Sequence, residues 1–122
     1  DGRVLRYVNA GHNPQFLIRS RGGITPLSST GLPIALYAGH GYAEEQVSLE
    51  PGDLLFFYTD GLVEAEDKDG DLFGADRLQQ LLAEAQARDI DSLLIHVEEH
   101  VRAFRGRVEP LDDATMMALR VI

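Results

Sequence analysis

The feature that most constrains the fold is a short apolar run bounded by two turn signals. Leu54-Leu55-Phe56-Phe57-Tyr58 contains no charged residue. It follows Glu50-Pro51-Gly52-Asp53, where proline presets φ and glycine accepts a positive φ, as in a tight turn. An uninterrupted apolar run of this length is typical of a β-strand covered on both faces. We therefore expect residues 54–58 to be the centre of the fold.

The rest of the first half also favours β structure. Short runs rich in β-branched and aromatic residues are separated by glycine, proline and asparagine. Arg21-Gly22-Gly23 has the composition of a hairpin turn. The expected strands are residues 3–8, 15–19, 24–27 and 42–49, with a final strand at 115–122.

Two segments of the second half have the spacing of amphipathic helices. Apolar residues fall at 78, 81, 82 and 85, and again at 90, 93, 94, 97, 101 and 104. This predicts helices over 76–86 and 90–104, the second capped by Asp89 or Asp91 and ended by Gly106. Antiparallel strands with flanking helices make an α+β fold.

Composition excludes several classes of protein. The 122 residues are 44% hydrophobic, enough for a packed core, and contain no cysteine for disulfides or thiolate chemistry. The net charge of −9, with Lys68 the single lysine, disfavours nucleic acid and anionic membranes as partners. No apolar run is long enough to span a bilayer. We expect a cytoplasmic protein that binds neither nucleic acid nor membrane.

Carboxylates stand at the ends of two expected strands. Asp60 follows the apolar run, and Asp112 and Asp113 precede the last strand. If these strands are antiparallel neighbours, the acids converge on one edge, where they repel unless they are protonated or bridged by cations. An oxygen-only ligand set suits Mg²⁺ or Mn²⁺, and Gly61 allows close approach of the backbone. The alternative, that both aspartates only form turns, is equally consistent with the residues alone.

Several phrases then follow one another in a fixed order. They are Tyr7-Val8-Asn9-Ala10-Gly11-His12-Asn13-Pro14, Leu49-Glu50-Pro51-Gly52-Asp53, Tyr58-Thr59-Asp60-Gly61-Leu62-Val63-Glu64-Ala65, Gly70, Phe73-Gly74, Arg77-Leu78 and Asp112-Asp113-Ala114-Thr115. This ordered set resembles the metal-dependent phosphatases of the PPM (type 2C) superfamily, in the SpoIIE/RsbU-type bacterial branch. The resemblance extends over nearly the whole chain.

The resemblance implies a β-sandwich flanked by helices and a metal-dependent phosphoserine or phosphothreonine phosphatase. In that family a water bridging two divalent cations, Mn²⁺ or Mg²⁺, attacks phosphorus in line. Asp60 and Asp112 are implied to bind the same cation. Asp113 is implied to stand beside the ligands. The implied substrate is a phosphorylated regulatory protein, such as an anti-sigma-factor antagonist, and the implied neighbour is an upstream sensor or receiver domain.

An accessory site is implied at two further residues. Many members of the superfamily hold a third, weaker cation with an acid four residues after the Asp-Gly aspartate, which corresponds to Glu64. The second accessory ligand corresponds to His12, and imidazole binds Mg²⁺ less well than carboxylate does. The alternative is that His12 only packs or forms hydrogen bonds in its turn.

One departure from the family pattern affects catalysis. The first metal-binding segment of the family, an aspartate near a Gly-His-Gly-type turn, has no counterpart before Tyr7. We therefore expect residues 1–122 to be the C-terminal portion of a single SpoIIE-type phosphatase domain, inactive by itself. The rival hypothesis is a catalytically inactive scaffold that binds a partner protein on the same fold.

Three other patterns suggest ligands less strongly. His96-Val97-Glu98-Glu99-His100 matches a zinc-peptidase motif, but we expect both histidines on the solvated flank of the helix. Asp67, Asp69 and Asp71 imitate a calcium loop, although the glycine is misplaced and position twelve is leucine, so a hairpin tip is expected. His40 has no recognisable partner and is expected in an exposed loop.

Overall fold

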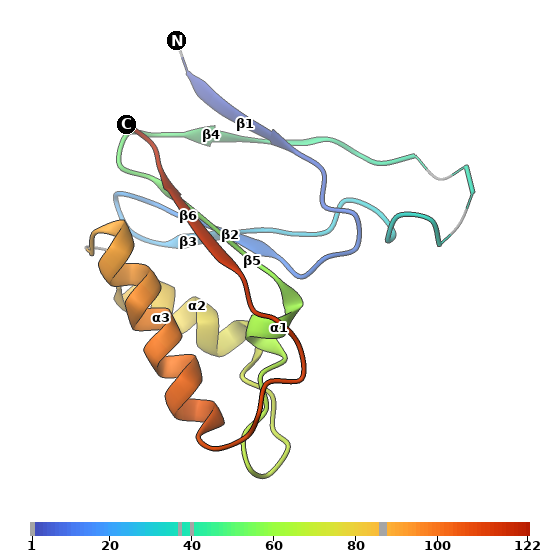
Figure 1. Cartoon of the computed structure of the whole chain (residues 1–122). Helices are drawn as coiled ribbons and strands as arrows, with labels where there is room; N and C mark the ends of the chain where they lie inside the picture. Colours follow the sequence, from blue (N-terminus) through green and yellow to red (C-terminus); the bar gives the residue numbers. More distant parts are fainter. Residues whose placement is uncertain (1, 37, 40, 86–87) are drawn as a thin grey trace.

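The computed structural model describes residues 2–36, 38–39, 41–85 and 88–122, and it has an α+β fold (Figure 1). The expected α+β class is confirmed. His40 lies outside the described residues. The elements are β1 (Arg3–Tyr7), β2 (Gln15–Ile18), β3 (Ile24–Leu27), β4 (Glu45–Leu49), β5 (Leu54–Tyr58), α1 (Asp60–Val63), α2 (Gly74–Glu84), α3 (Ile90–Arg105) and β6 (Met116–Arg120).

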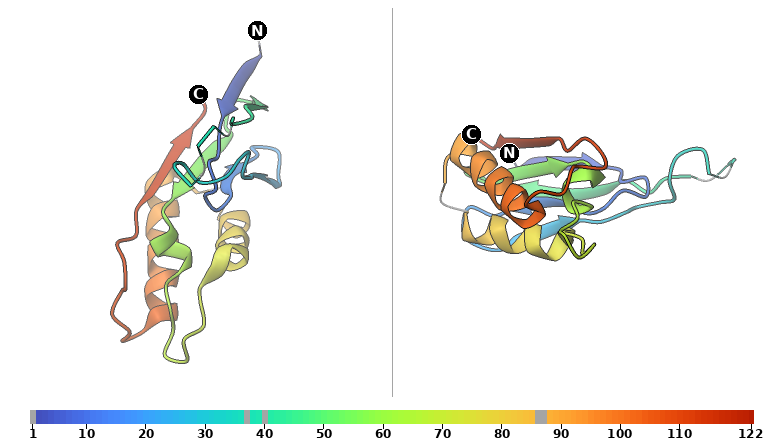
Figure 2. Two further views of the ribbon diagram at one scale, coloured as in Figure 1. Left: turned by 90° about the vertical axis from the view of Figure 1, so that its right-hand side faces the viewer. Right: turned by 60° about the horizontal axis from the view of Figure 1, so that its bottom comes forward.

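The strands form two antiparallel sheets. One has four strands in the order β3-β2-β5-β6, and the other pairs β1 with β4. Figures 1 and 2 show the β1–β4 pair on one side of the larger sheet and α2 and α3 on the other. This is the layered arrangement that the sequence predicts.

β5 is covered on both faces, as its apolar run requires. Its residues 54, 56 and 58 join the core that includes α2 and α3, whereas Leu55 packs with Leu17 and Leu27 beneath β1 and β4. Phe56 is completely buried and lies opposite Phe16 of β2. Each fully buried side chain of this size stabilises the fold by about 1.5–3 kcal/mol. β5 is therefore a rigid support for whatever follows at its ends.

Element ends differ from the sequence predictions by a few residues. β4 begins at Glu45, not at residue 42, because its partner β1 ends at Tyr7, which lies opposite Glu45. β6 spans only the residues that pair with β5. Asp89 caps α3 as expected, accepting a hydrogen bond from the Ser92 backbone N–H at 2.9 Å. In the described part of the chain, no helix combines the length and apolarity needed to cross a bilayer.

Candidate metal-binding edge of the sheet

Two acidic turns meet at the edge of the sheet where β5 ends and β6 begins. The two strands are antiparallel neighbours, so the pairing on which the convergence of the acids depends is confirmed. Backbone pairing continues beyond both strands, because the Thr59 N–H donates to the Thr115 carbonyl at 3.0 Å. The Thr115 N–H in turn donates to the Thr59 hydroxyl at 2.9 Å. These bonds fix the segment after Thr59 beside the segment before Thr115.

Gly61 is required by the closeness of these two segments. A Cβ atom at this position would collide with the backbone carbonyl oxygen of Asp113. Gly61 thus lets the backbone of the Asp112-Asp113 turn approach closely. That it also brings the backbone close to a ligand of Asp60 stays a prediction. The contact joins the start of α1 to the start of the last strand.

The carboxylate of Asp60 contacts the described residues through only one of its two oxygens. Oδ1 accepts a hydrogen bond from the Asn13 side-chain amide at 3.0 Å and lies 3.3 Å from Nε2 of His12. No hydrogen bond or ion pair among the described residues involves Oδ2. The side chain is 49% exposed. Oδ2 is thus available to a ligand from solvent.

Tyr58 anchors the loop that approaches Asp60. Its hydroxyl donates to the Pro14 carbonyl at 2.7 Å, and its ring packs against Phe16. Burial, with the charge of Asp60 contributing, raises the pKa of Tyr58 to about 12. The hydroxyl therefore stays protonated at neutral pH and keeps donating to Pro14.

Asp112 and Asp113 line a cavity of about 420 Å³ beside α1. Both are exposed, and the Asp113 backbone N–H donates to Asp112 Oδ1 at 2.7 Å. Glu64 lines the same cavity, and Arg105 from the end of α3 is the basic residue in its wall. The cavity gathers carboxylates from the segment after α1 and from the segment before β6, and Asp60 is not among its lining residues.

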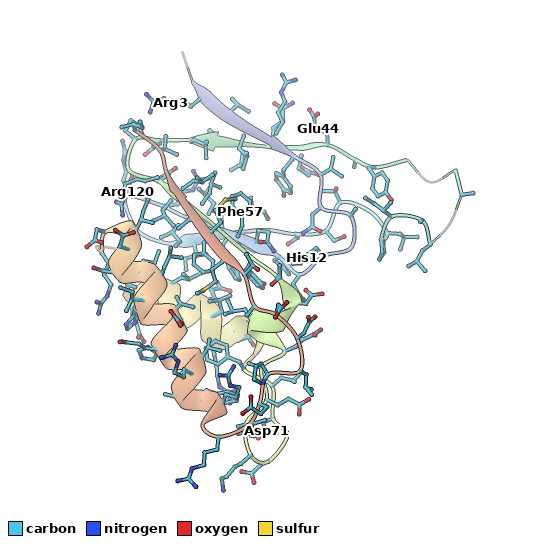
Figure 3. All side chains as sticks on the ribbon, viewed as in Figure 1. Arg3, His12, Glu44, Phe57, Asp71 and Arg120 are labelled. Carbon is cyan, nitrogen blue, oxygen red and sulfur yellow. The ribbon has the colours of Figure 1, made fainter. Side chains whose placement is uncertain are left out.

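His12 and Glu64 lie on different sides of this edge. The ring of His12, labelled in Figure 3 near the start of α1, borders a second cavity of about 310 Å³ together with Tyr58. Glu64 follows Asp60 by one helical turn, with its N–H donating to the Asp60 carbonyl at 2.9 Å. Across the described ranges, no three acidic or histidine side chains gather closely enough to hold a metal ion. A shared accessory site stays a prediction.

Sequence reasoning missed two residues at the site, Asn13 and Gln15. Asn13 bonds Asp60 directly, and the Gln15 side chain bonds both His12 and the Tyr58 backbone. From the sequence alone, Asn13 belongs to a turn and Gln15 to the start of a strand. The residues around Asn13, including Pro14, have the composition of an ordinary turn. They give no sign that Asn13 bonds Asp60, 47 positions away.

The other ligand-like patterns have structural explanations. The 66–72 segment is a hairpin tip, as expected, where Asp67 Oδ1 accepts bonds from the backbone N–H groups of Asp69 and Asp71. His100 is exposed, but His96 is half-buried and its Nε2 is enclosed, so the expectation of a solvated flank is wrong for His96. α3 turns this residue partly toward the protein. Burial, then the charges of His100 and Arg88, lowers the pKa of His96.

Comparison with known proteins gives a consistent picture. Residues 1–122 match the family of stage II sporulation protein E (SpoIIE). Protein IcfG of Synechocystis is 31% identical over 94% of the chain, and the phosphoserine phosphatase RsbU of Bacillus subtilis is 25% identical over 98%. The SiaA-PP2C domain of Pseudomonas aeruginosa has the same fold, with a TM-score of 0.84 and 20% identity over 98% of the chain. The chain spans 18% of IcfG, 36% of RsbU and 47% of the SiaA chain.

Proposed function

This chain belongs to the SpoIIE family, in the SpoIIE/RsbU-type branch of the PPM phosphatases, and from that premise we propose a specific activity. Residues 1–122 form the C-terminal part of a phosphatase domain that hydrolyses phosphoserine or phosphothreonine in a bacterial regulatory protein. The domain depends on Mn²⁺ or Mg²⁺, two cations per complete domain.

One observation carries the proposal: the availability of Asp60 Oδ2 at the edge where the two acidic turns meet. A carboxylate with only a structural role in its turn would accept hydrogen bonds from nearby backbone N–H groups. The carboxylate of Asp60 is instead engaged through Oδ1 by a distant loop, while Oδ2 has no partner among the described residues and the side chain is half exposed. Asp112 and Asp113 are held nearby by the Gly61 contact. Oxygen donors of this kind suit hard divalent cations.

Asp60 and Asp112 would hold one cation, with Asp113 beside them. Two carboxylates supply only part of a binding site, so the remaining ligands belong to other parts of the domain. When bound, the cations supply an activated water and neutralise charge on the phosphoryl group. The chain's own residues orient Asp60 and fix the Asp112-Asp113 turn against α1. Glu64 and His12 are proposed as accessory or supporting residues.

The partner is proposed to be a phosphorylated regulatory protein of the anti-sigma-factor-antagonist type. The family membership and the similarity to a curated phosphoserine phosphatase support this class of substrate. We also propose that a sensor or receiver domain lies upstream in the full-length protein and that the protein is cytoplasmic.

The test is hydrolysis of a phosphoserine peptide and of p-nitrophenyl phosphate by the complete domain. We expect turnover with Mn²⁺ or Mg²⁺ and none in excess chelator. Unchanged rates in chelator would contradict the metal-dependent activity. Absence of turnover with every cation and both substrates would favour the scaffold hypothesis instead.

A further inference from the structure

We propose that Asn13 and His12 are positioning residues that hold Asp60 for the cation by occupying its Oδ1 atom. This inference rests on the proposed role of Asp60 as a metal ligand. It adds a defined task for the 9–15 loop: a hydrogen bond from Asn13 and an electrostatic contact from His12 engage Oδ1 and leave the other oxygen, Oδ2, for the metal. The loop thereby favours binding through a single oxygen.

The backbone of the loop is fixed by Asn9, which is only 8% exposed. Asn9 Oδ1 accepts a hydrogen bond from the His12 backbone N–H at 2.8 Å, and its Nδ2 donates to the Leu27 carbonyl at 3.1 Å. The hydroxyl of Tyr58 holds Pro14, as described above. Both residues that face Asp60 therefore lie between fixed points of the loop.

Gln15 fixes the orientation of the His12 ring. The backbone N–H of Tyr58 donates to Gln15 Oε1 at 2.8 Å. Because a backbone N–H is always a donor, this bond identifies the oxygen of the Gln15 amide and places its NH₂ on the other side. That NH₂ lies 2.9 Å from Nδ1 of His12 and 3.0 Å from the Asn13 carbonyl oxygen.

This arrangement assigns the hydrogen of the neutral His12 ring to Nε2. With Nδ1 unprotonated, Nδ1 accepts from Gln15, and the Nε2–H group faces Asp60 Oδ1 at 3.3 Å, a favourable electrostatic contact. With the hydrogen on Nδ1, two donors would face each other at Gln15, and the Nε2 lone pair would face a carboxylate. The Asn13 carbonyl, 2.9 Å from Nδ1, favours that second tautomer by one bond. The Nδ1–H tautomer leaves two repulsive contacts, with the Gln15 amide and with Asp60. The Nε2–H tautomer leaves one, with the Asn13 carbonyl.

The contact acts on orientation more than on stability. The His12 and Asp60 side chains are 40% and 49% exposed, and ion pairs between exposed side chains contribute little to folding stability. Groups that orient a metal ligand nevertheless matter for binding, because their loss typically weakens metal affinity about 10- to 100-fold. We therefore expect substitutions in the loop to reduce metal affinity while leaving the fold intact.

The first test is the tautomer of His12 in the metal-free complete domain. Long-range ¹⁵N–¹H correlation spectra, recorded at mildly alkaline pH where an ordinary histidine is neutral, distinguish protonated from unprotonated ring nitrogens. We expect Nε2 to be protonated and Nδ1 to be unprotonated, with the assignment confirmed by loss of the signal in His12→Gln. A ring protonated on Nδ1, or rapid averaging between the two tautomers, would overturn the proposal.

The second test is calorimetric titration of the complete domain with Mn²⁺. We expect Asn13→Ala and His12→Phe to bind about 10- to 100-fold more weakly, with unchanged melting temperature. His12→Gln, whose amide can replace the Nε2–H donor, should recover most of the affinity. Gln80→Ala, which removes an exposed amide bonded only to Glu84 of its own helix, is the control and should bind as the wild type does.

The outcomes separate this inference from the proposed function. If Asp60→Asn abolishes Mn²⁺ binding while Asn13→Ala and His12→Phe bind normally, the positioning role is wrong and the metal ligand stands. If Asp60→Asn itself binds normally, the proposed function of Asp60 fails. Equal losses in His12→Gln and His12→Phe would also contradict positioning through an N–H group that faces Asp60 Oδ1.

Discussion

The two ends of β5 carry aspartates in opposite situations. Asp53, before the strand, is 1% exposed and has both oxygens engaged by the Ser20 and Glu50 backbone N–H groups and the Arg19 guanidinium. Asp60, after the strand, is about half exposed and has one oxygen engaged. Both residues flank the same apolar run and both stand next to glycine.

The difference separates a structural carboxylate from the proposed metal ligand. The carboxylate of Asp53 is fully engaged in hydrogen bonds within the protein, and these bonds connect the β4–β5 turn to the end of β2. Asp60 is oriented by the protein but not satisfied by it. Buried charges must find their partners within the fold, whereas an exposed carboxylate held in one orientation is free to bind a ligand. The comparison therefore predicts that Asp53 governs stability and Asp60 governs activity.

The largest effect is expected for Asp60→Asn in the complete domain. Loss of a charged ligand should lower turnover about 100- to 1000-fold, the range seen when one group that stabilises the transition state is removed. The melting temperature should hardly change, because the side chain is half exposed. Steady-state kinetics with Mn²⁺ measure the effect, and Asp69→Asn in the exposed hairpin is the control. Normal turnover in Asp60→Asn would contradict the prediction that Asp60 governs activity.

Asp53→Ala should have the largest effect on folding stability. It leaves two backbone N–H groups without their acceptor and removes one of several partners of the Arg19 guanidinium, which keeps its bonds to Thr25 and Ser48. The expected cost is about 2–3 kcal/mol, after allowance for the 26% exposure of Arg19. Denaturant unfolding measures the loss, with Asp69→Ala as the control. A loss below about 0.5 kcal/mol, as at ordinary surface positions, would mean that Asp53 is not structural.

Low pH should also destabilise the fold through Asp53. Burial alone would raise the pKa of Asp53, but the N–H groups of Ser20 and Glu50 and the charge of Arg19 outweigh it and hold the pKa below its usual value. The folded state thus binds fewer protons than the unfolded state. This stabilisation is complete above the unfolded pKa of about 3.9 and is lost as pH falls through the lower folded pKa. Asp53→Ala should flatten the acid limb of the curve of unfolding free energy against pH. An unchanged acid limb would contradict this assignment.

Gly61→Ala should have an intermediate effect. The added methyl group collides with the Asp113 carbonyl, so the two acidic turns must move apart, at a cost of about 1–2 kcal/mol. Thermal unfolding measures this cost. Gly41→Ala is the matched control, because nothing lies within 4 Å of a Cβ at that position. If both variants were equally stable, the close contact between the turns would be refuted.

The smallest effect is expected for the histidine pair of α3. The rings of His96 and His100 lie 4.2 Å apart between centroids, but we expect no structural zinc there. Replacing the exposed His100 by alanine, which breaks the pair, should change the unfolding free energy by less than about 0.5 kcal/mol. Chemical denaturation with and without added zinc is the measurement. A loss of several kcal/mol that zinc reverses in the wild type would contradict the prediction.

Much of the fold follows from local sequence signals. The apolar run of β5, the helical spacing in α3 and its Asp89 cap are properties of neighbouring residues, so they were predictable. The pairing of β5 with β6 is a supposition that the sequence does not decide. The structure supplies it, and with it the meeting of the two acidic turns. The bond between Asn13 and Asp60 was not predictable, because it joins residues 47 positions apart in a loop whose own turn residues already explain its composition. The burial of His96 likewise depends on how α3 is rotated against the core.

The central claim is that divalent cations bind at the Asp60 end of β5 and not at the Asp53 end. The most direct measurement is paramagnetic broadening of backbone amide signals in the complete domain by substoichiometric Mn²⁺. Seven residue steps separate the two aspartates, roughly 23 Å along an extended strand, so the two ends are resolved. We predict broadening at residues 59–64 and 112–115, with residues 50–53 and the acidic hairpin at 66–71 much less affected. Broadening centred on Asp53 or on the hairpin, or none at residues 59–64, would contradict the account.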